Sequence, residues 1–358
     1  MRKILFLFLV LIGLLACRKQ DKGIPNPEPK PVFLRAVDIS AYPEIALARP
    51  VFYNAAGVQQ DYLEILKESG VNVVRLKLWV DPANQHASLA EVKSFSEILR
   101  NSGFKTWITV HYSDTWADPG HQQIPARWAS LDFETLKDSV FAYTVKVVRE
   151  IEPDYIQIGN EINPGLLLPS GSISLHLQQF QALLQTAAEA VRQTNKTTQI
   201  IIHYAGFEDA DSFFEQTKSI NYDIIGLSYY PLWHGKSLDK LKQKMQYLTA
   251  TFEKKIVIAE TAYPFTLGWN DWTNNIVGLP EQLILPDFPA TEEGQRNFLQ
   301  EIKTITQEVD GGIGFCYWGA ELIAWKGPEA TDASPWENQA VFDFSNRALP
   351  VLEVFKEE

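Results

Sequence analysis

Short runs of apolar residues recur along the chain, and each run is followed by polar residues and then by a segment with helical spacing. Runs of this length, rich in Val and Ile and bounded by polar turns, predict buried β-strands. Eight such runs are present, at residues 32–38, 71–79, 106–112, 155–160, 199–204, 224–229, 256–260 and 312–318.

Helices are predicted between these strands, at residues 58–69, 88–101, 132–151, 175–194, 209–219, 238–251 and 291–309, with a final stretch from residue 350. Gly70, Gly103 and Pro153 follow the first three, as expected of helix ends. Because alternating strands and helices favour parallel pairing, the pattern predicts an α/β fold, a single (β/α)8 TIM barrel over residues 32–358. A doubly wound open sheet is the alternative, but its first strand is not followed by a glycine-rich phosphate loop.

The amino-terminal segment has a different pattern. Residues 4–16 are apolar but too few to cross a bilayer as a helix, so residues 1–16 predict a signal peptide. The segment ends in Leu14-Leu-Ala-Cys17, which resembles a lipobox, and we expect Cys17 to be lipidated and to become the new amino terminus. An ordinary secretory peptide with an incidental cysteine is the alternative.

Residues 17–31 are polar, with prolines at alternate positions from Pro25 to Pro31, and predict an extended, solvated tether. Arg18 and Lys19 do not resemble an inner-membrane retention signal. We therefore expect an exported protein that is anchored through Cys17 to the outer membrane, with the cell surface as an open alternative.

Charge and cysteine content narrow the set of partners. The formal net charge is −12 at pH 7, which argues against nucleic acid as a partner. Cys316 is the one cysteine besides Cys17, and it lies in an apolar run, so we expect a small buried side chain and no intrachain disulfide. We expect the protein to be a monomer.

Two glutamates follow apolar runs: Glu161 after the fourth strand and Glu260 at the end of the seventh. In a (β/α)8 barrel, catalytic groups lie at the carboxyl ends of the strands. A retaining glycosidase needs two carboxyl groups roughly 5 Å apart, one that donates a proton and one that attacks the anomeric carbon. Asn160 beside Glu161 suits an acid/base, so we predict Glu161 as acid/base and Glu260 as nucleophile; a capping or loop carboxylate is the alternative for either one alone.

Two further residues are expected to support Glu260. Arg75 should point inward from the second strand, pair with Glu260 and keep its pKa low, although a bridge to a structural carboxylate is the alternative. Period-two alternation puts Tyr230 on the same inward face as Ser228, so we expect Tyr230 to donate a hydrogen bond to Glu260, with Tyr229 as the alternative.

Aromatic and polar residues near the strand ends are candidates for sugar binding. Trp318 should form the floor under the reacting sugar, because an indole stacks on the apolar face of a sugar ring. Trp79, Trp116 and Trp233 are candidates for other subsites, or else loop core. The polar candidates for sugar hydroxyls are Asp38, His111, Asp114 and His234. None of the histidines has zinc-ligand spacing, and His111 and His203 are equally consistent with satisfied barrel histidines.

Longer motifs carry a family resemblance. They are Arg35-Ala-Val-Asp-Ile-Ser40, Val74-Arg-Leu-Lys-Leu-Trp-Val-Asp-Pro82, His111-Tyr-Ser-Asp-Thr-Trp-Ala-Asp-Pro-Gly-His121, Gly226-Leu-Ser-Tyr-Tyr-Pro-Leu-Trp-His234 and Trp336-Glu-Asn-Gln-Ala-Val-Phe-Asp343. With Asn160-Glu161 and Glu260, they resemble the endo-β-1,4-galactanases of glycoside hydrolase family 53, in the clan of retaining (β/α)8 glycosidases. The resemblance implies endo-cleavage of β-1,4-galactosidic bonds in galactan and type I arabinogalactan side chains of pectin, without a cofactor for catalysis. The alternatives are a retaining glycanase for mannan, xylan or glucan, and a non-catalytic glycan-binding lipoprotein.

The resemblance also suggests a structural calcium ion that ties the long loop after the seventh strand to the loop after the eighth. The candidate ligands are Asp271, Asn275 and Asp332. Asn-rich loops are also common as plain turns, and the spacing is not that of a recognised calcium loop.

Overall fold

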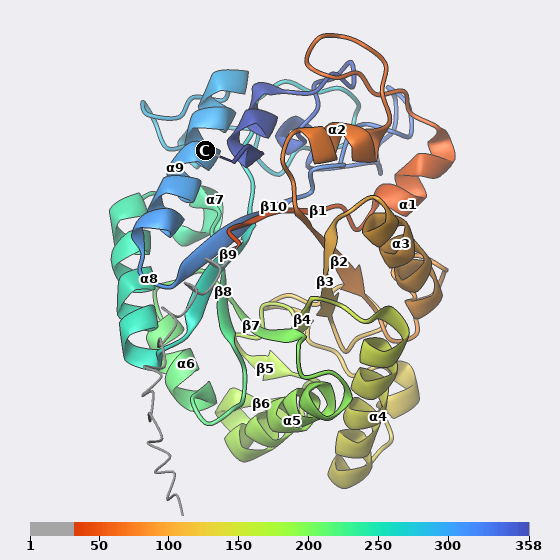
Figure 1. The fold of residues 1–358 in the computed structure, drawn as a ribbon, viewed down its shortest axis with the longest axis vertical. Coiled ribbons are helices and arrows are strands. Elements are labelled where there is room, and N and C mark those ends of the chain that lie inside the picture. The colour runs from red at the N-terminus through yellow and green to blue at the C-terminus, as the bar shows by residue number, and fades with distance from the viewer. Residues whose placement is uncertain (1–31, 358) are drawn as a thin grey trace, which may run out of the picture. The chain divides into compact units, whose positions relative to one another are not determined.

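Eight parallel strands close into a barrel, which confirms the predicted fold (Figure 1). The barrel strands are β1 (Leu34–Asp38), β2 (Val73–Leu78), β3 (Lys105–Val110), β4 (Tyr155–Ile158), β7 (Gln199–Ala205), β8 (Ile224–Ser228), β9 (Lys255–Thr261) and β10 (Gly312–Trp318). Each strand pairs with its neighbour in the chain, and β10 pairs with β1 to complete the ring. This computed structural model describes residues 32–357; the predicted signal peptide, Cys17 and the tether lie outside the described residues.

Helices surround the barrel (Figure 1). They are α2 (Tyr62–Glu68), α3 (Leu89–Asn101), α4 (Phe133–Ile151), α5 (Ile173–Thr194), α6 (Ala210–Thr217), α8 (Leu238–Phe252) and α9 (Glu292–Glu308). The stretch from residue 350 is a 3-10 helix, Pro350–Phe355. The first helix begins later than predicted, because the Asp61 side chain caps it by accepting from the backbone amides of Leu63 and Glu64.

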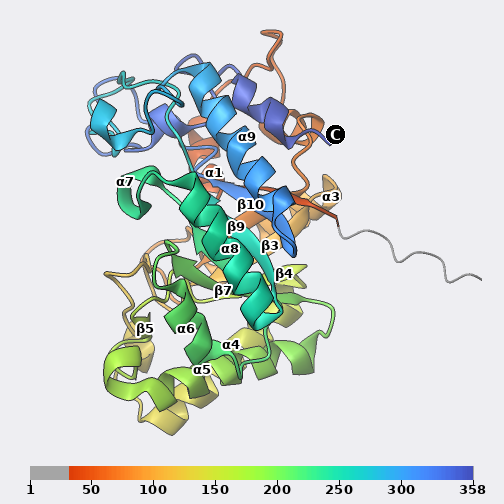
Figure 2. The ribbon, with the colours of Figure 1, turned by 90° about the vertical axis from the view of Figure 1, so that its left-hand side faces the viewer.

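Several short elements were not predicted. They are α1 (Tyr42–Ile45), α7 (Pro231–His234), the hairpin of β5 (Gly165–Leu166) and β6 (Gly171–Ser172), and 3-10 turns at Ala46–Ala48, Ala126–Trp128, Pro280–Gln282 and Glu337–Gln339. Elements of two to four residues carry too little periodicity to be read from one sequence. Viewed from the side, α7 projects from the same side of the barrel as the loops that follow β9 and β10 (Figure 2).

The barrel interior has two layers, which follow from period-two alternation along the strands. The amino-end layer is apolar and consists of Leu34, Ala36, Val73, Trp107, Tyr155, Ile201, Ile224, Val257, Ala259 and Cys316. The carboxyl-end layer lies two or four residues further along the strands and consists of the buried polar residues Asp38, Arg75, Thr109, Gln157, His203 and Ser228. Cys316 is buried and free, as expected. Among residues 32–357, no helix combines the length and the apolar character needed to cross a membrane.

Candidate active site

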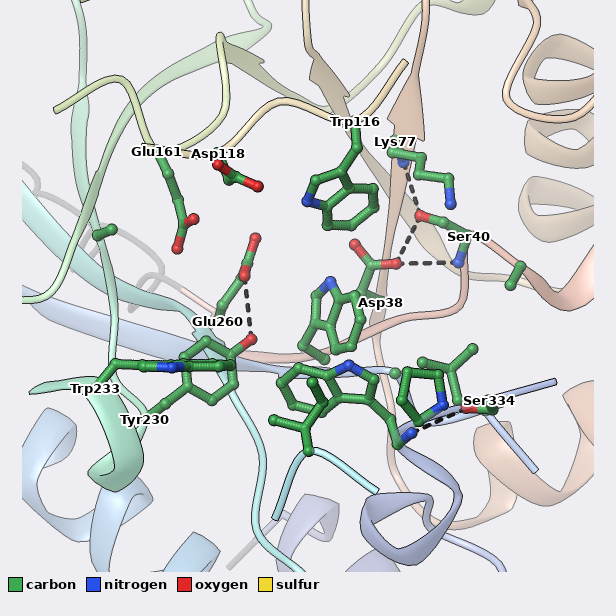
Figure 3. Close-up of a pocket in the computed structure, with 18 of the residues that line it drawn as sticks. Asp38, Ser40, Lys77, Trp116, Asp118, Glu161, Tyr230, Trp233, Glu260 and Ser334 are labelled. Atoms are coloured by element: carbon green, nitrogen blue, oxygen red, sulfur yellow. Dashed lines mark hydrogen bonds between the residues drawn. The ribbon is translucent and has the colours of Figure 1, made fainter. Parts of the chain in front are cut away.

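A cavity of about 660 Å³ opens at the carboxyl ends of the strands (Figure 3). Its wall includes both predicted glutamates, together with Asp38, Trp116, Tyr230 and Trp318. These residues come from β1, β3, β4, β8, β9, β10 and the loops after them. The cavity therefore lies where a (β/α)8 barrel places its active site.

Glu260 reaches the cavity because β9 is irregular. Val257 and Ala259 lie in the amino-end layer, so strict alternation would turn Glu260 outward. The pairing of β8 with β9 shifts there: Leu227 is opposite Ile258, but the next residue, Ser228, is opposite Glu260. This bulge adds one residue to β9 and turns the Glu260 side chain inward, where it is buried.

Glu161 reaches the cavity through a tight turn after β4. Gly159 has φ 76°, and a Cβ built on it would lie 2.5 Å from Cγ2 of Ile162, so the turn needs glycine. Glu161 itself has φ 48°, in the left-handed region, which costs a residue with a side chain about 1–3 kcal/mol. The surrounding structure holds this conformation, and the carboxyl group faces Glu260 across the cavity (Figure 3).

The two carboxyl groups are close to each other. One oxygen of Glu161, one oxygen of Glu260 and a ring nitrogen of His203 lie within 4.8 Å of one another. Retaining glycosidases have carboxyl groups about 5–5.5 Å apart, whereas inverting enzymes need about 6.5–9.5 Å to admit water. The spacing therefore fits the retaining arrangement.

Arg75 connects Glu260 with the rest of the site. Its Nη2 donates to Glu260 Oε1 and to Asn160 Oδ1, each at 2.8 Å, and its Nη1 donates to Asp38 Oδ2 at 2.7 Å. The Tyr230 hydroxyl donates to Glu260 Oε2 at 3.0 Å, the contact that alternation predicted. Both oxygens of Glu260 are thus held by donors, and its carboxylate is fixed in orientation.

Glu161 has a different set of partners. The Ser228 hydroxyl donates to Glu161 Oε1, and His203 Nε2 lies 2.9 Å from Ser228 Oγ. The other ring nitrogen of His203, Nδ1, lies 3.0 Å from Gln157 Nε2 and 3.1 Å from Asn160 Oδ1. Both nitrogens of His203 are therefore used in hydrogen bonds, and the group of Glu161, His203 and Glu260 is accounted for without a metal ion.

Burial and neighbouring charge separate the roles of the two glutamates. Burial, followed by the charge of Glu260, raises the pKa of Glu161 to about 8, against the opposing effects of the Ser228 hydrogen bond and the charge of Arg75. Burial also raises the pKa of Glu260, and Arg75 and Tyr230 lower it. The expectation that Arg75 keeps this pKa low is therefore wrong in its net direction, because burial outweighs the charge of Arg75. The ionised form of Glu260 is stabilised by two donors, Arg75 and Tyr230, whereas Glu161 accepts from one hydroxyl. When one of the two glutamates is protonated, the proton therefore resides on Glu161.

Aromatic rings form a continuous wall of the cavity. Trp318 lies between Trp116 and Trp336, with ring centroids 5.9 and 4.5 Å away, and Trp233 lies 5.9 Å from Trp336. Trp233 is 53% exposed, so its ring is open to a ligand. Of the predicted sugar-binding residues, Asp38, Trp116, Trp233, His234 and Trp318 line the cavity.

Three predicted residues lie behind this wall. Trp79 Nε1 donates to His111 Nδ1 at 3.2 Å, and the same nitrogen accepts from the Ala117 amide at 3.1 Å. Asp114 accepts from the backbone amides of Asp81 and Ala126. Their polar atoms hold the loop after β3 in place, so the expectation that Trp79, His111 and Asp114 contact sugar is not supported by their positions.

Several lining residues were missed by sequence reasoning. They are Ser40, Lys77, Asp118, Glu321 and Trp336. Lys77 could have been found, because it is two residues beyond Arg75 on the inward face of the same strand. Asp118 and Trp336 lie within motifs that were recognised, whereas Glu321 lies in an irregular loop after β10 and has no local signal.

The predicted calcium ligands are only partly brought together. Asp271 Oδ2, Asn275 Oδ1 and Glu337 Oε2 are buried and have no hydrogen-bond partner within residues 32–357. Glu337 Oε1 accepts from the Asn270 amide at 2.6 Å and the Asp271 amide at 3.4 Å, so it joins the loop after β10 to the loop after β9. Asp332 does not take part, because it is exposed and pairs with Lys326 at 3.0 Å. Glu337 fits the ligand set better than Asp332 does.

The chain is similar to known glycoside hydrolases. The chain matches the family model for Glycosyl hydrolase family 53 over residues 34–355. It is similar to the arabinogalactan endo-beta-1,4-galactanase of Cellvibrio japonicus, with 33% identity over 324 residues that cover 85% of each chain. It is also similar to the endo-beta-1,4-galactanase of Bacillus subtilis, with 29% identity over 374 residues that cover 90% of this chain and 85% of the relative.

A solved structure has the same fold. The GH53 catalytic domain of Ignisphaera aggregans superposes with a TM-score of 0.86 and 36% identity, covering 92% of this chain and 97% of that domain. The family match extends over nearly the whole described barrel and includes both cavity glutamates. The chain therefore belongs to glycosyl hydrolase family 53.

Proposed function

We propose that this protein is a retaining endo-β-1,4-galactanase that cleaves galactan and type I arabinogalactan side chains of pectin. The observation that carries the proposal is the pair of carboxyl groups, half-buried Glu161 and buried Glu260, with oxygens within 4.8 Å, in a barrel of this family. The sugar specificity is supported by the relatives, which are named as galactanases. The acidic chain suits a neutral polysaccharide, because a polyanion such as polygalacturonate would be repelled.

The geometry supports a two-step reaction. In the first step, Glu260 attacks the anomeric carbon while Glu161 gives its proton to the oxygen of the departing sugar chain. In the second step, Glu161 takes a proton from water, and the water oxygen replaces Glu260 on the anomeric carbon. Each step inverts the anomeric centre, so the product retains the starting configuration.

The surrounding residues have supporting roles in this scheme. Arg75 and Tyr230 hold both oxygens of Glu260, and Asn160 holds Arg75 through Oδ1 while its own amide donates to the Ala117 carbonyl at 2.9 Å. Trp318 would form the floor under the reacting sugar, and its ring contacts with Trp116 and Trp336 support this role. Rigid placement of the reacting groups supplies much of the rate enhancement in such sites.

Hydrolysis of a panel of polysaccharides tests the function. The mature chain should release galactose oligosaccharides from potato galactan, with products of several lengths on chromatography, and should act poorly on mannan, xylan and β-glucan. Proton NMR of the first products should show the β anomer. Preferential release from another polysaccharide would reject the galactan specificity, and an initial α anomer would reject the retaining mechanism.

Export and anchoring form a separate part of the proposal. The apolar segment 4–16 and the lipobox-like sequence that ends at Cys17 support a lipoprotein in the outer membrane. Cells that express the full chain should incorporate labelled palmitate into it, whereas Cys17→Ala should abolish the label. Palmitate-free protein from wild-type cells would reject the anchor without affecting the enzymatic proposal.

Three buried oxygens without hydrogen-bond partners within residues 32–357, one of them from Glu337, support a structural cation. Asp271, Asn275 and Glu337 would hold a calcium ion, since this ion takes carboxylate and amide oxygens as ligands. Its contribution would be to tie the loop after β9 to the loop after β10, away from the reacting carboxyl groups.

A further inference from the structure

A second polar surface lines the cavity beyond the two reacting carboxyl groups. Lys77 and Glu321 both belong to the cavity wall. Figure 3 places Asp38, Ser40 and Lys77 on one side of Glu260, with Glu161 on the other side. In the proposed reaction Glu161 protonates the departing sugar, so the Lys77 side faces the glycone, the part of the substrate that precedes the broken bond.

Glu321 has a buried oxygen without a partner. The residue is 2% exposed, and its Oε1 accepts from the Ala41 amide at 2.7 Å. Its Oε2 has no hydrogen-bond partner within residues 32–357. A buried carboxyl oxygen that is left unpaired is costly, so proteins rarely keep one without a use. Glu321 belongs to the cavity wall but Oε2 itself is buried, so a rotation of the carboxyl group would let a ligand supply the missing partner.

Lys77 provides the complementary group. Its Nζ lies 5.0 Å from the Trp79 ring centroid and 5.1 Å from that of Trp116, and no carboxylate of residues 32–357 forms an ion pair with it. Its backbone amide donates to Ser40 Oγ at 2.8 Å, and the Ser40 hydroxyl donates to Asp38 Oδ1 at 2.6 Å. Lys77 is therefore tied to the residues that hold Arg75 and Glu260.

The two groups together suit the hydroxyls of a neutral sugar. An ammonium group offers donors only, whereas a carboxyl group with a free oxygen accepts, and it also donates when protonated. Burial raises the pKa of Glu321 to about 8, and Lys77 opposes that shift, so the two residues are near enough to affect each other. A sugar carboxylate would meet Asp38 and Glu260 as well as Lys77, which disfavours a uronic acid.

We propose that Lys77 and Glu321 form a glycone-side subsite that binds hydroxyl groups of a neutral hexose and so determines which sugars enter the cleft ahead of the broken bond. This assignment rests on the proposed galactanase function. It gives the buried oxygen of Glu321 and the ammonium group of Lys77 hydrogen-bond partners, which residues 32–357 do not supply.

A covalent inactivator that fills only the glycone side tests the assignment. We would measure inactivation by 2-deoxy-2-fluoro-β-1,4-galactobiosyl fluoride, which transfers its sugar to the nucleophile and releases fluoride. Above pH 8, where Glu321 is ionised and its change to an amide removes a charge, Lys77→Met and Glu321→Gln should each lower the second-order rate constant about 10- to 100-fold, the loss expected for a hydrogen bond to a charged group. Lys242→Met is the matched control, because Lys242 is exposed on α8 and pairs with Glu308.

A second readout separates binding from structural damage. After the first step, added galactobiose competes with water for the glycosyl-enzyme, and this partition reports on the departing-sugar side. It should be unchanged in both variants. If the partition changes while the inactivation rate stays at the wild-type value, Lys77 and Glu321 act on the departing-sugar side, and the assignment is rejected. If the inactivation rate and the partition change to the same extent, the two residues have a structural role, and the assignment is rejected too.

The failure of the broader proposal would look different. A wild-type protein that neither hydrolyses galactan nor reacts with the inactivator would reject the galactanase function, and the subsite would fall with it. A wild-type protein that does both, with variants that match Lys242→Met, would reject the subsite alone. If Lys77→Met does not fold, by circular dichroism, Glu321→Gln decides, because the amide oxygen keeps the bond to Ala41.

Discussion

The two layers of the barrel interior are built from the same strands but have opposite properties. In the amino-end layer, inward positions such as Ile201 and Val73 are fully buried and apolar. In the carboxyl-end layer, two residues further along, the inward positions are His203 and Arg75, which are equally buried but polar. The first layer stabilises the fold through burial, whereas the second places charge in a site that burial alone would disfavour.

This difference shows how the barrel tolerates its active site. Arg75 is 2% exposed, yet each hydrogen bond of its guanidinium group goes to a carboxylate or an amide oxygen. Removing one charged member of such a network destabilises the folded state, because the charge that remains is buried without a partner. The apolar layer beneath it supplies the stability that the polar layer does not.

Removing the nucleophile should separate activity from stability most sharply. Glu260→Ala should reduce kcat for galactan on the order of 10⁴-fold or more, because the covalent step loses its attacking group. Glu260→Gln should be equally inactive but should unfold at nearly the wild-type temperature, since its amide oxygen still accepts from Arg75 or Tyr230. Full activity in either variant would contradict the mechanism. With an aryl galactobioside, azide should restore turnover of Glu260→Ala and give the α-azide.

A change in the amino-end layer should have the opposite effect. Ile201→Ala leaves a cavity in the apolar layer and should lower the free energy of unfolding by about 2–5 kcal/mol in urea denaturation. At a temperature where the variant is folded, its kcat should stay within about twofold of wild type, because Ile201 belongs to the apolar layer and not to the cavity wall. A large loss of kcat with an unchanged urea midpoint would mean that the two layers do not divide their roles in this way.

The pH profile tests the state of Glu161. Its pKa is raised to about 8, so the acid is protonated at neutral pH and kcat/KM should fall about tenfold per pH unit above that value. The Ser228 hydrogen bond lowers this pKa, so Ser228→Ala should move the alkaline limb to higher pH. Thr261→Ser, on the neighbouring strand, is a control that should leave the limb in place. A shift to lower pH in Ser228→Ala would show that Ser228 does not stabilise the ionised form.

The smallest expected effect concerns the loops above the carboxyl-end layer. Chelation by EDTA should lower the melting temperature on the order of 5 °C, and calcium should restore it, if Asp271, Asn275 and Glu337 hold a cation. Glu337→Gln should lose the calcium response, whereas Asp332→Asn should keep it, because Asp332 pairs with Lys326 instead. An identical melting temperature with and without calcium in the wild type would reject the site.

Much of this architecture could be predicted from the sequence, because apolar runs and alternation are local patterns. The eight strands were predicted from short apolar runs, and the position of Tyr230 followed from alternation with Ser228. The roles of Trp79, His111 and Asp114 could not be decided from the sequence, because a polar side chain near a strand end can serve either a ligand or a loop backbone. Only the contacts, such as the bonds from Asp114 to the amides of Asp81 and Ala126, distinguish the two.

By itself, the sequence determined the barrel, the two glutamates at the ends of its fourth and seventh strands, and the apolar layer beneath them. These features depend on the pattern of apolar and polar residues along single strands, which can be read directly from the sequence. The tertiary structure decided that a bulge turns Glu260 inward, that Glu161 adopts a left-handed conformation, and that Glu321 lines the cavity. Such features arise from register and packing between segments distant in the chain, and no local pattern records them.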